Sequence, residues 1–527
     1  MPRLPSFPLL ALVALAGSAT AQDLMLTSRP TRWRFTVERF SANSSNDLGL
    51  VGAHYDLLDV APETLPGAYV GLGGYGAVTG TTGGLFFGGP TVGWLKELYP
   101  GWMLDVAVMA GGGGGGGADT GSGLFFRPHL AVEYAVGLAA VRLELAHLGF
   151  SNGDLDDTHL ALGFSLPGEL LLADHGRQPD EVPGDDLLWR RVRITPNVTR
   201  IYTSDNERTN PAASGAGNAP LSDDVELGGL ALDYFLSESL FIPLELAGAI
   251  GGGVGGFAMA MGGIGGSLPL FERLRLEGRL LAGAGGGGDV DTGGGLLLKG
   301  AAGVSWAFGG NMALELLGGY ITAPDGDLDG TTLTAGISWN PRSAELSWDY
   351  PRSSLDSDGL SASAAELDAT RVQALHKSYF PASSAKTKNG QDIEEPIHML
   401  GAGVTRPIEL FDQDFALTGR LFTAYEGESG GYAEATGGLQ YELKPFTSLR
   451  FHTVLLRAEV GAGGGGDVDV SSGLIYHLAA GWRFQYSKNL SFHLDVGSVE
   501  SDRGSFEGES LTVGVGYMLN RAIFADG

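Results

Sequence analysis

Apolar and polar side chains alternate along many short stretches of this chain. In one stretch every second residue is apolar and large: Trp102, Leu104, Val106 and Val108. The residues between them include Asp105 and Ala107, and a second stretch places Arg142 and Glu144 between large apolar residues in the same way. A period of two is typical of a β-strand with one apolar and one polar face. Segments of about ten residues with this alternation indicate a transmembrane β-barrel.

A glycine-rich motif divides the chain into three similar units. The run Gly111–Gly117 is followed by Asp119, and related runs occur at 283–293 and 461–471 with Asp291 and Asp469 in the matching place. The spacing is about one third of the chain, and each run lies between apolar segments. The sequence therefore predicts a threefold internal repeat rather than flexible glycine linkers.

Each unit accommodates about eight strands of the length that a barrel uses. In the first unit we expect them near residues 32–41, 48–57, 67–78, 84–95, 102–112, 124–136, 140–150 and 158–166. Short connections such as 136–140 alternate with longer polar ones such as 204–224. Outer-membrane barrels have short turns on the periplasmic side and long loops outside. The glycine runs are thus expected at the outer end of each unit's fifth strand.

Transmembrane helices are the alternative for the long uncharged stretch 246–270. The equivalent stretch of the third unit, 421–439, carries Glu426, Glu428 and Glu434. Glycine also costs about 1 kcal/mol relative to alanine in a helix interior. These observations favour strands.

The fold class expected is therefore all-β, an antiparallel transmembrane barrel protein of three repeats. We expect a signal peptide at 1–21, barrel repeats at 22–168, 191–340 and 371–527, and linkers at 169–190 and 341–370. Three tandem small barrels are favoured over one barrel of about 24 strands, because an unplugged barrel of that size holds a wide aqueous channel and no plug domain is evident. Inward-facing charges of the first unit are of both signs and would fill a narrow interior: Asp105, Arg127, Glu133, Arg142 and Glu144.

Tryptophans occur where strands are expected to end on the short-turn side: Trp94, Trp102, Trp306 and Trp339. Such a position is typical of the aromatic girdle at a membrane interface. A soluble β protein with tryptophans in its core is the alternative. The start of the chain favours the membrane, because a basic residue, an apolar stretch and Ala19-Thr20-Ala21 before Gln22 form a secretory signal.

Composition narrows the compartment and the partners. The 527 residues contain no cysteine, which excludes disulfides and thiolate metal sites, and the formal net charge of −28 opposes nucleic-acid binding. A bacterial outer-membrane location fits these features. The expected partners are outer-membrane lipid, lipopolysaccharide and the envelope assembly machinery.

One acidic loop resembles the start of a calcium-binding loop. Asp325, Asp327 and Asp329 with the following Gly330 have the D-x-D-x-D-G pattern but lack the distal Glu of an EF-hand. The turn propensity of Asp and Gly also explains this loop without a metal. No cofactor is expected, and calcium at these three aspartates is the candidate ion.

A second motif resembles the lipid A deacylases, which are small barrels with a His-x-Ser-Asn motif followed by a Glu. Here His147 is separated from Ser151 and Asn152 by a longer interval, and no suitable Glu follows. Four residues along a strand span roughly 13 Å, whereas nucleophilic catalysis needs the Ser and His within hydrogen-bond reach. We therefore expect no enzyme activity, with a lipid-modifying hydrolase as the alternative.

Two classes of function remain open from the sequence. The first is a passive envelope protein with a structural, surface-binding or passive transport role, including a wide export or diffusion pore. The second is an outer-membrane enzyme acting on lipid. No phosphate-binding loop, zinc-ligand spacing or nucleophile elbow occurs in the chain.

Overall fold

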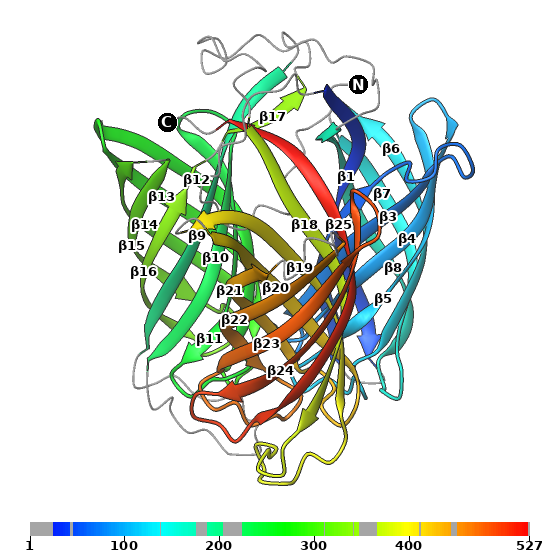
Figure 1. Ribbon diagram of the computed structural model, residues 1–527. Helices are drawn as coiled ribbons and strands as arrows, with labels where there is room; N and C mark the ends of the chain where they lie inside the picture. Colours follow the sequence, from blue (N-terminus) through cyan, green and yellow to red (C-terminus); the bar gives the residue numbers. More distant parts are fainter. Residues whose placement is uncertain are drawn as a thin grey trace.

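The computed structural model describes residues 25–42, 46–137, 139–174, 187–203, 224–309, 311–340, 342–346, 366–410, 413–443 and 451–524. These residues form strands β1 to β25 (Figure 1). In this part of the chain no helix is both long and apolar enough to span a membrane. The expected signal peptide lies outside the described residues, as do residues 175–186 and 347–365 of the two expected linkers.

The first eight strands close into one antiparallel barrel, here called barrel 1. They are β1 (Met25–Ala42), β2 (Asn46–Leu57), β3 (Ala68–Thr79), β4 (Phe86–Tyr99), β5 (Trp102–Gly114), β6 (Phe125–Val136), β7 (Ala139–Phe150) and β8 (Asp156–Asp174). Closure is made by β1 and β8, whose register runs from Met25↔Asp174 to Glu38↔Ala161. No strand edge of this barrel is therefore left unpaired along that register.

Barrel 2 is formed by the next eight strands. They are β9 (Leu187–Thr203), β10 (Val225–Phe235), β11 (Leu240–Gly251), β12 (Ala258–Phe271), β13 (Leu274–Gly286), β14 (Leu296–Gly309), β15 (Met312–Thr322) and β16 (Asp329–Trp339). Pairing of β16 with β9, from Gly330↔Thr203 to Trp339↔Ile194, closes it.

Barrel 3 is formed by the last eight strands. They are β18 (Glu366–Pro381), β19 (Ile397–Leu410), β20 (Gln413–Glu426), β21 (Ala433–Leu443), β22 (His452–Gly464), β23 (Leu474–Gln485), β24 (Leu490–Ser501) and β25 (Glu507–Phe524). Pairing of β18 with β25 closes it. The short strand β17 (Arg342–Leu346) pairs with both β9 and β25 and joins barrels 2 and 3.

The expected fold class is confirmed: the protein is all-β and consists of three closed eight-stranded antiparallel barrels. A single barrel of about 24 strands is not formed, because each unit pairs its first strand with its eighth. Figure 1 shows the three barrels side by side, with barrel 1 in blue to cyan, barrel 2 in green and barrel 3 in yellow to red.

Alternation along each strand decides which side chains enter a barrel. Asp105 and Arg142 have no exposed surface inside barrel 1, whereas Leu143 and Leu162 are 52% and 63% exposed on its outside. Large exposed apolar residues occur in the same way on the other two barrels, for example Leu280 and Leu478. Each barrel thus has a polar interior and an apolar exterior, the opposite of a soluble protein and the arrangement that lipid requires.

The barrels contact each other in a cyclic order. The fifth strand of each barrel contacts the third strand of a neighbour: β5 with β20, β13 with β3, and β22 with β11. Near the places where one unit ends and the next begins, β8 contacts β25 and β17. The same kind of heterologous contact is thus used three times. It closes the three repeats into a ring with approximate threefold symmetry.

The tryptophans expected in the membrane-interface girdle differ in their surroundings. Trp102 and Trp306 are 46% and 48% exposed at the short-turn ends of their strands, as an interfacial girdle requires. Trp339 is different, because the guanidinium of Arg406 from barrel 3 lies 4.6 Å from its ring centroid. Trp339 belongs to the contact between barrels 2 and 3, which strand ends alone did not reveal.

Candidate functional site

The interior of barrel 1 is filled by a network of ion pairs. Arg142 donates to Asp105 at 2.7 Å, to Glu133 at 2.5 Å and to Glu144 at 2.7 Å. Arg32 adds further bonds to the carboxylates of Asp105 and Glu133. These side chains are at most 4% exposed. The five charges that the sequence places inside the first unit lie together here, with Arg127 paired to Glu144 at 2.6 Å.

Barrels 2 and 3 contain ion-pair networks made by other residues. In barrel 2, Arg193 bonds Asp233 at 2.6 Å, and Lys299 bonds Glu245 at 2.8 Å. In barrel 3, Arg457 bonds Asp495 at 3.1 Å. The networks differ in residues and positions, but in every barrel basic and acidic groups neutralise each other within a narrow low-dielectric interior.

The outer end of each interior is filled by apolar side chains. In barrel 1 this cluster includes Leu50, Tyr75, Phe87, Phe125 and Phe150, with ring centroids of Phe87 and Phe125 4.9 Å apart. Equivalent clusters occur in barrels 2 and 3. Ion pairs and apolar clusters together leave these eight-stranded barrels as packed cores, which is the behaviour expected of barrels of this size.

The glycine runs adopt a backbone that only glycine adopts readily. Four consecutive residues at the end of β5 and directly after it, Gly114 to Gly117, have φ between +62° and +157°. The loops after β13 and β22 repeat this backbone and end with an aspartate at the fourth position, Asp289 at φ +63° and Asp467 at φ +60°. A run of residues in the left-handed region is strained for any side chain with a Cβ. The conformation of these loops therefore favours glycine at the first three of these positions, and the fourth also accepts aspartate.

The same glycine loops form the contacts between barrels. A Cβ at Gly112 would lie 2.4 Å from the Ala424 carbonyl oxygen of barrel 3. A Cβ at Gly84 would lie 2.3 Å from the Gly287 nitrogen of barrel 2. Barrels 2 and 3 approach equally closely. Glycine serves close packing here, because backbone meets backbone across each interface.

Backbone hydrogen bonds cross two of these interfaces. Gly83 donates to the Gly293 carbonyl at 3.0 Å, joining barrels 1 and 2, and Gly255 donates to the Ser471 carbonyl at 2.8 Å, joining barrels 2 and 3. Lys388, from the loop between β18 and β19, also crosses between barrels, with Nζ 3.6 Å from the Asp289 carboxylate. Three close contacts therefore join the barrels: Gly112 with Ala424, Gly84 with Gly287, and Gly255 with Ser471. We call the segments that make these contacts, together with Lys388, the glycine ring.

The three barrels enclose an apolar chamber of about 2790 Å³. It is lined by outward-facing side chains from every barrel, among them Leu72, Val198, Leu246, Leu400 and Leu421. Residues of the glycine ring, including Lys388 and Asn389, line the same chamber. The volume exceeds the roughly 300–1,000 Å³ of a site for a drug-sized ligand. The lining predicts an apolar occupant.

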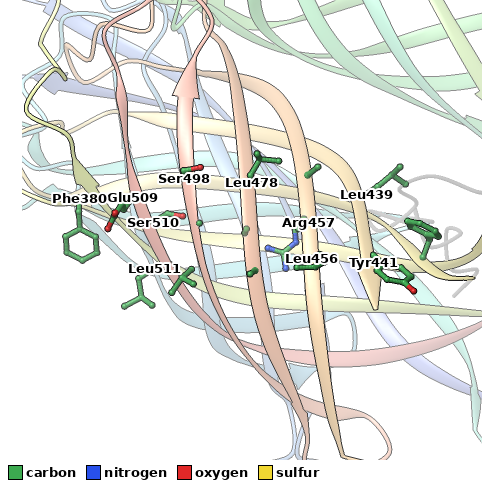
Figure 2. Close-up of a pocket in the computed structure, with 16 residues that line it drawn as sticks. Phe380, Leu439, Tyr441, Leu456, Arg457, Leu478, Ser498, Glu509, Ser510 and Leu511 are labelled. Atoms are coloured by element: carbon green, nitrogen blue, oxygen red, sulfur yellow. The ribbon is translucent and has the colours of Figure 1, made fainter. Parts of the chain in front are cut away.

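A second, shallower hollow of about 890 Å³ lies on barrel 3. Figure 2 shows Leu456, Leu478 and Leu511 along it, with Ser498 and Glu509 near one end. Leu456 and Leu478 are exposed on the outside of the barrel. The hollow therefore belongs to the lipid-facing surface.

The expected calcium loop packs against the glycine loop of its own barrel. The backbone nitrogens of Asp327 and Leu328 donate to the Asp291 carbonyl at 3.1 and 3.0 Å, and the Tyr320 hydroxyl donates to the Asp329 carboxylate. Asp325 and Asp327 are exposed. Among the described residues, no group of three or more acidic or histidine side chains is arranged to hold a metal ion. Calcium binding at Asp325, Asp327 and Asp329 stays a prediction.

The backbone pattern of that loop is repeated in the other barrels. The Asp119 carbonyl accepts from Asp154 at 3.1 Å, and the Asp469 carbonyl accepts from Phe506 at 3.1 Å. The matched aspartates therefore hold the glycine loop to the loop that precedes the eighth strand.

His147 lies at the outer end of β7, where the deacylase-like motif is expected. Its Nδ1 is 3.0 Å from the Thr158 hydroxyl, and its Nε2 is 3.8 Å from Asp156. Among the described residues, no hydrogen bond or ion pair connects His147 with Ser151. The Ser151 backbone nitrogen donates to the Leu124 carbonyl. The geometry supplies no activated serine at this motif, and the question of enzyme activity stays open to experiment.

Reasoning from the sequence missed the chamber and Lys388. Outward-facing leucines look alike whether they face bulk lipid or another barrel, because the period of two distinguishes only inside from outside. The one available signal was the glycine runs, because residues without a Cβ permit the close approach of another backbone.

Comparisons with known proteins give distant matches among solved structures. No protein-family model matches the sequence, and no curated protein matches it. Among solved structures, Neisserial surface protein A matches at 13% identity and a TM-score of 0.21, over 28% of this chain and 96% of its own. OpdL of Pseudomonas aeruginosa matches at 11% identity and a TM-score of 0.21, over 94% and 99%. The siderophore receptor PirA of Pseudomonas aeruginosa matches at 9% identity and a TM-score of 0.25, over 93% and 80%.

TM-scores this low carry no argument about the function of the chain, and the class rests on the barrels themselves. Closed antiparallel barrels satisfy every backbone group within the sheet, and an apolar exterior over an ionic interior suits strands that cross lipid. The protein is an outer-membrane β-barrel protein, located in the bacterial outer membrane.

Proposed function

We propose that this protein is a structural, non-conducting component of the outer membrane. The observation that carries the proposal is the filling of all three interiors. Arg127 and Arg142 in barrel 1 and Arg193 in barrel 2 are fully buried or nearly so, and Lys377 in barrel 3 has no exposed surface. Diffusion of solutes requires an aqueous lumen, which wider barrels provide.

The glycine ring supports the same proposal. Three barrels that contact through backbone, with hydrogen bonds from Gly83 to Gly293 and from Gly255 to Ser471, form one body rather than three independently moving units. Such a body presents a broad outer surface made of the loops of all three barrels. Lipopolysaccharide and the assembly machinery are the partners that we propose for this surface and for its insertion into the membrane.

Conductance across a planar lipid bilayer tests this proposal. The purified full chain is expected to produce no stable current steps above those of the protein-free bilayer, while a channel-forming outer-membrane protein reconstituted in parallel produces them. Heat-modifiable migration on a gel confirms that the sample is folded. Stable single-channel steps from the folded chain would make the protein a pore and overturn the proposal.

A further inference from the structure

We propose that the central chamber binds a phospholipid, with its acyl chains between the barrels and its phosphate at the periplasmic end. This inference goes beyond the proposed structural role, since a scaffold needs no bound lipid. It begins from the chamber walls, which are lined mainly by glycines and by apolar side chains that project outward from the barrels. Leu72 is 37% exposed, Leu246 44% and Leu421 52%. Acyl chains are the apolar material available at membrane depth.

The outer end of the chamber is closed to a lipid head group. There the glycine ring brings backbone atoms of neighbouring barrels into contact, and a Cβ at Gly256 would lie 2.8 Å from the Gly465 nitrogen. Lys388 Nζ also reaches the Gly255 carbonyl of barrel 2 at 3.4 Å. Lipopolysaccharide keeps its head group at the outer surface, so it would reach the chamber only by displacing this ring.

The opposite end carries a cation. Arg29 lines the chamber near the start of β1 and is exposed. Asp59 also lines the chamber, and its carboxylate accepts from the Gly67 nitrogen at 2.8 Å. The register partner of Arg29 on β8 is Leu170, which also lines the chamber. Strands β1 and β8 have 18 and 19 residues, whereas about 9–11 residues cross the bilayer. Arg29 therefore lies in the extension beyond the hydrocarbon, at the level of head groups on the periplasmic side.

A guanidinium at that level suits a phosphate. Arginine presents paired N–H donors that match phosphate oxygens, and the interaction is strong where water is partly excluded. The formal net charge of the chain is −28, so a cation at the chamber mouth is not explained by a generally basic surface. Apolar walls, a closed outer end and a cation at the inner end together match a phospholipid of the inner leaflet.

Variants that fill the chamber test the proposal. Ala335→Trp in barrel 2 and Ala402→Trp in barrel 3 place bulk on two residues that line it. The matched control is Ala302→Trp with Ala480→Trp, which changes the same residue type on outward faces of the same two barrels outside the chamber. Each full-length protein is purified from outer membranes, washed extensively in mild detergent, and extracted with organic solvent. Phospholipid and lipid A per protein are then measured by mass spectrometry.

The wild type and the control are expected to retain phospholipid through washing, and the filled variant to lose most of it. Arg29→Glu is expected to lower retention at least several-fold without changing heat-modifiable migration. Equal phospholipid in the filled variant and the control would overturn the proposal, and so would retention of lipid A in place of phospholipid. Bilayer conductance of the same preparations is recorded separately, so that failure of lipid binding is distinguished from failure of the structural role.

Discussion

At the scale of single residues, Arg142 holds the interior of barrel 1 together. Its guanidinium neutralises Asp105, Glu133 and Glu144, all of which are at most 2% exposed. A buried ion pair adds little net stability compared with apolar packing, but removal of one partner leaves uncompensated charge. The ionic interior is thus sensitive to single substitutions even though its net contribution is small.

We expect Arg142→Met to destabilise the protein by about 3–5 kcal/mol, because three buried carboxylates lose their shared partner. The matched control is Arg200→Met, whose guanidinium is 48% exposed beside Asp224 and whose loss is expected to leave the stability almost unchanged, because solvent screens an exposed ion pair. Urea unfolding in phospholipid vesicles, followed by tryptophan fluorescence, measures both. Adding Asp105→Asn and Glu133→Gln to Arg142→Met should recover part of the loss, and equal stability of the two single variants would contradict the role of the network.

At the scale of elements, the pairing of β1 with β8 makes barrel 1 a complete unit. The register extends from Met25↔Asp174 to Glu38↔Ala161, so the described closure includes residues past 168, the end expected for the first repeat. Strand β8, which contributes these pairs, also contacts β25 and β17. The eighth strand therefore serves both closure and assembly.

Because barrel 1 closes on itself, residues 22–174 are expected to fold alone in detergent. A shorter fragment, residues 22–155, lacks β8 and exposes two unpaired edges, which is costly in lipid. Protease-resistant strand content by circular dichroism and heat-modifiable migration distinguish them. Aggregation of the longer fragment under conditions that refold the full chain would show that closure depends on the neighbouring barrels.

At the scale of the whole molecule, the glycine ring decides how the barrels sit together. The same loops show positive φ inside each barrel and near-contact distances across barrels. One sequence feature thus satisfies a local and a tertiary requirement. The cyclic order of contacts follows from repetition of one interface three times within a single chain.

We expect Gly112→Val to loosen barrel 1 from barrel 3, since its Cβ would lie 2.5 Å from the Thr423 hydroxyl and 2.4 Å from the Ala424 carbonyl oxygen. Gly278→Val is the control, because a Cβ there meets nothing within 4 Å. A protease site placed between residues 175 and 186 allows barrel 1 to be cut from the rest. Barrel 1 should stay bound after cleavage in the wild type and in Gly278→Val, but separate in Gly112→Val; co-purification of the fragments in all three would refute the role of this contact.

The strands, the faces that they present and the number of units could be predicted from the amino-acid sequence alone. Alternation placed Asp105 and Arg142 inside and Leu143 outside, because successive side chains of a strand point to opposite faces. Recurrence of the glycine run with Asp119, Asp291 and Asp469 marked three units. These features are local, so the pattern of side chains along the chain was sufficient to predict them.

Which outward-facing residues meet another barrel depends on how the three barrels pack together. Leu72 and Leu143 are both apolar residues on the outside of barrel 1, yet Leu72 lines the chamber between barrels. Nothing in a period of two distinguishes them, since both surfaces exclude water and favour the same side chains. The placement of Lys388 beside Asp289 and of Arg406 over Trp339 depends in the same way on contacts between units. Such contacts arise from the packing of whole barrels, which the local pattern does not encode.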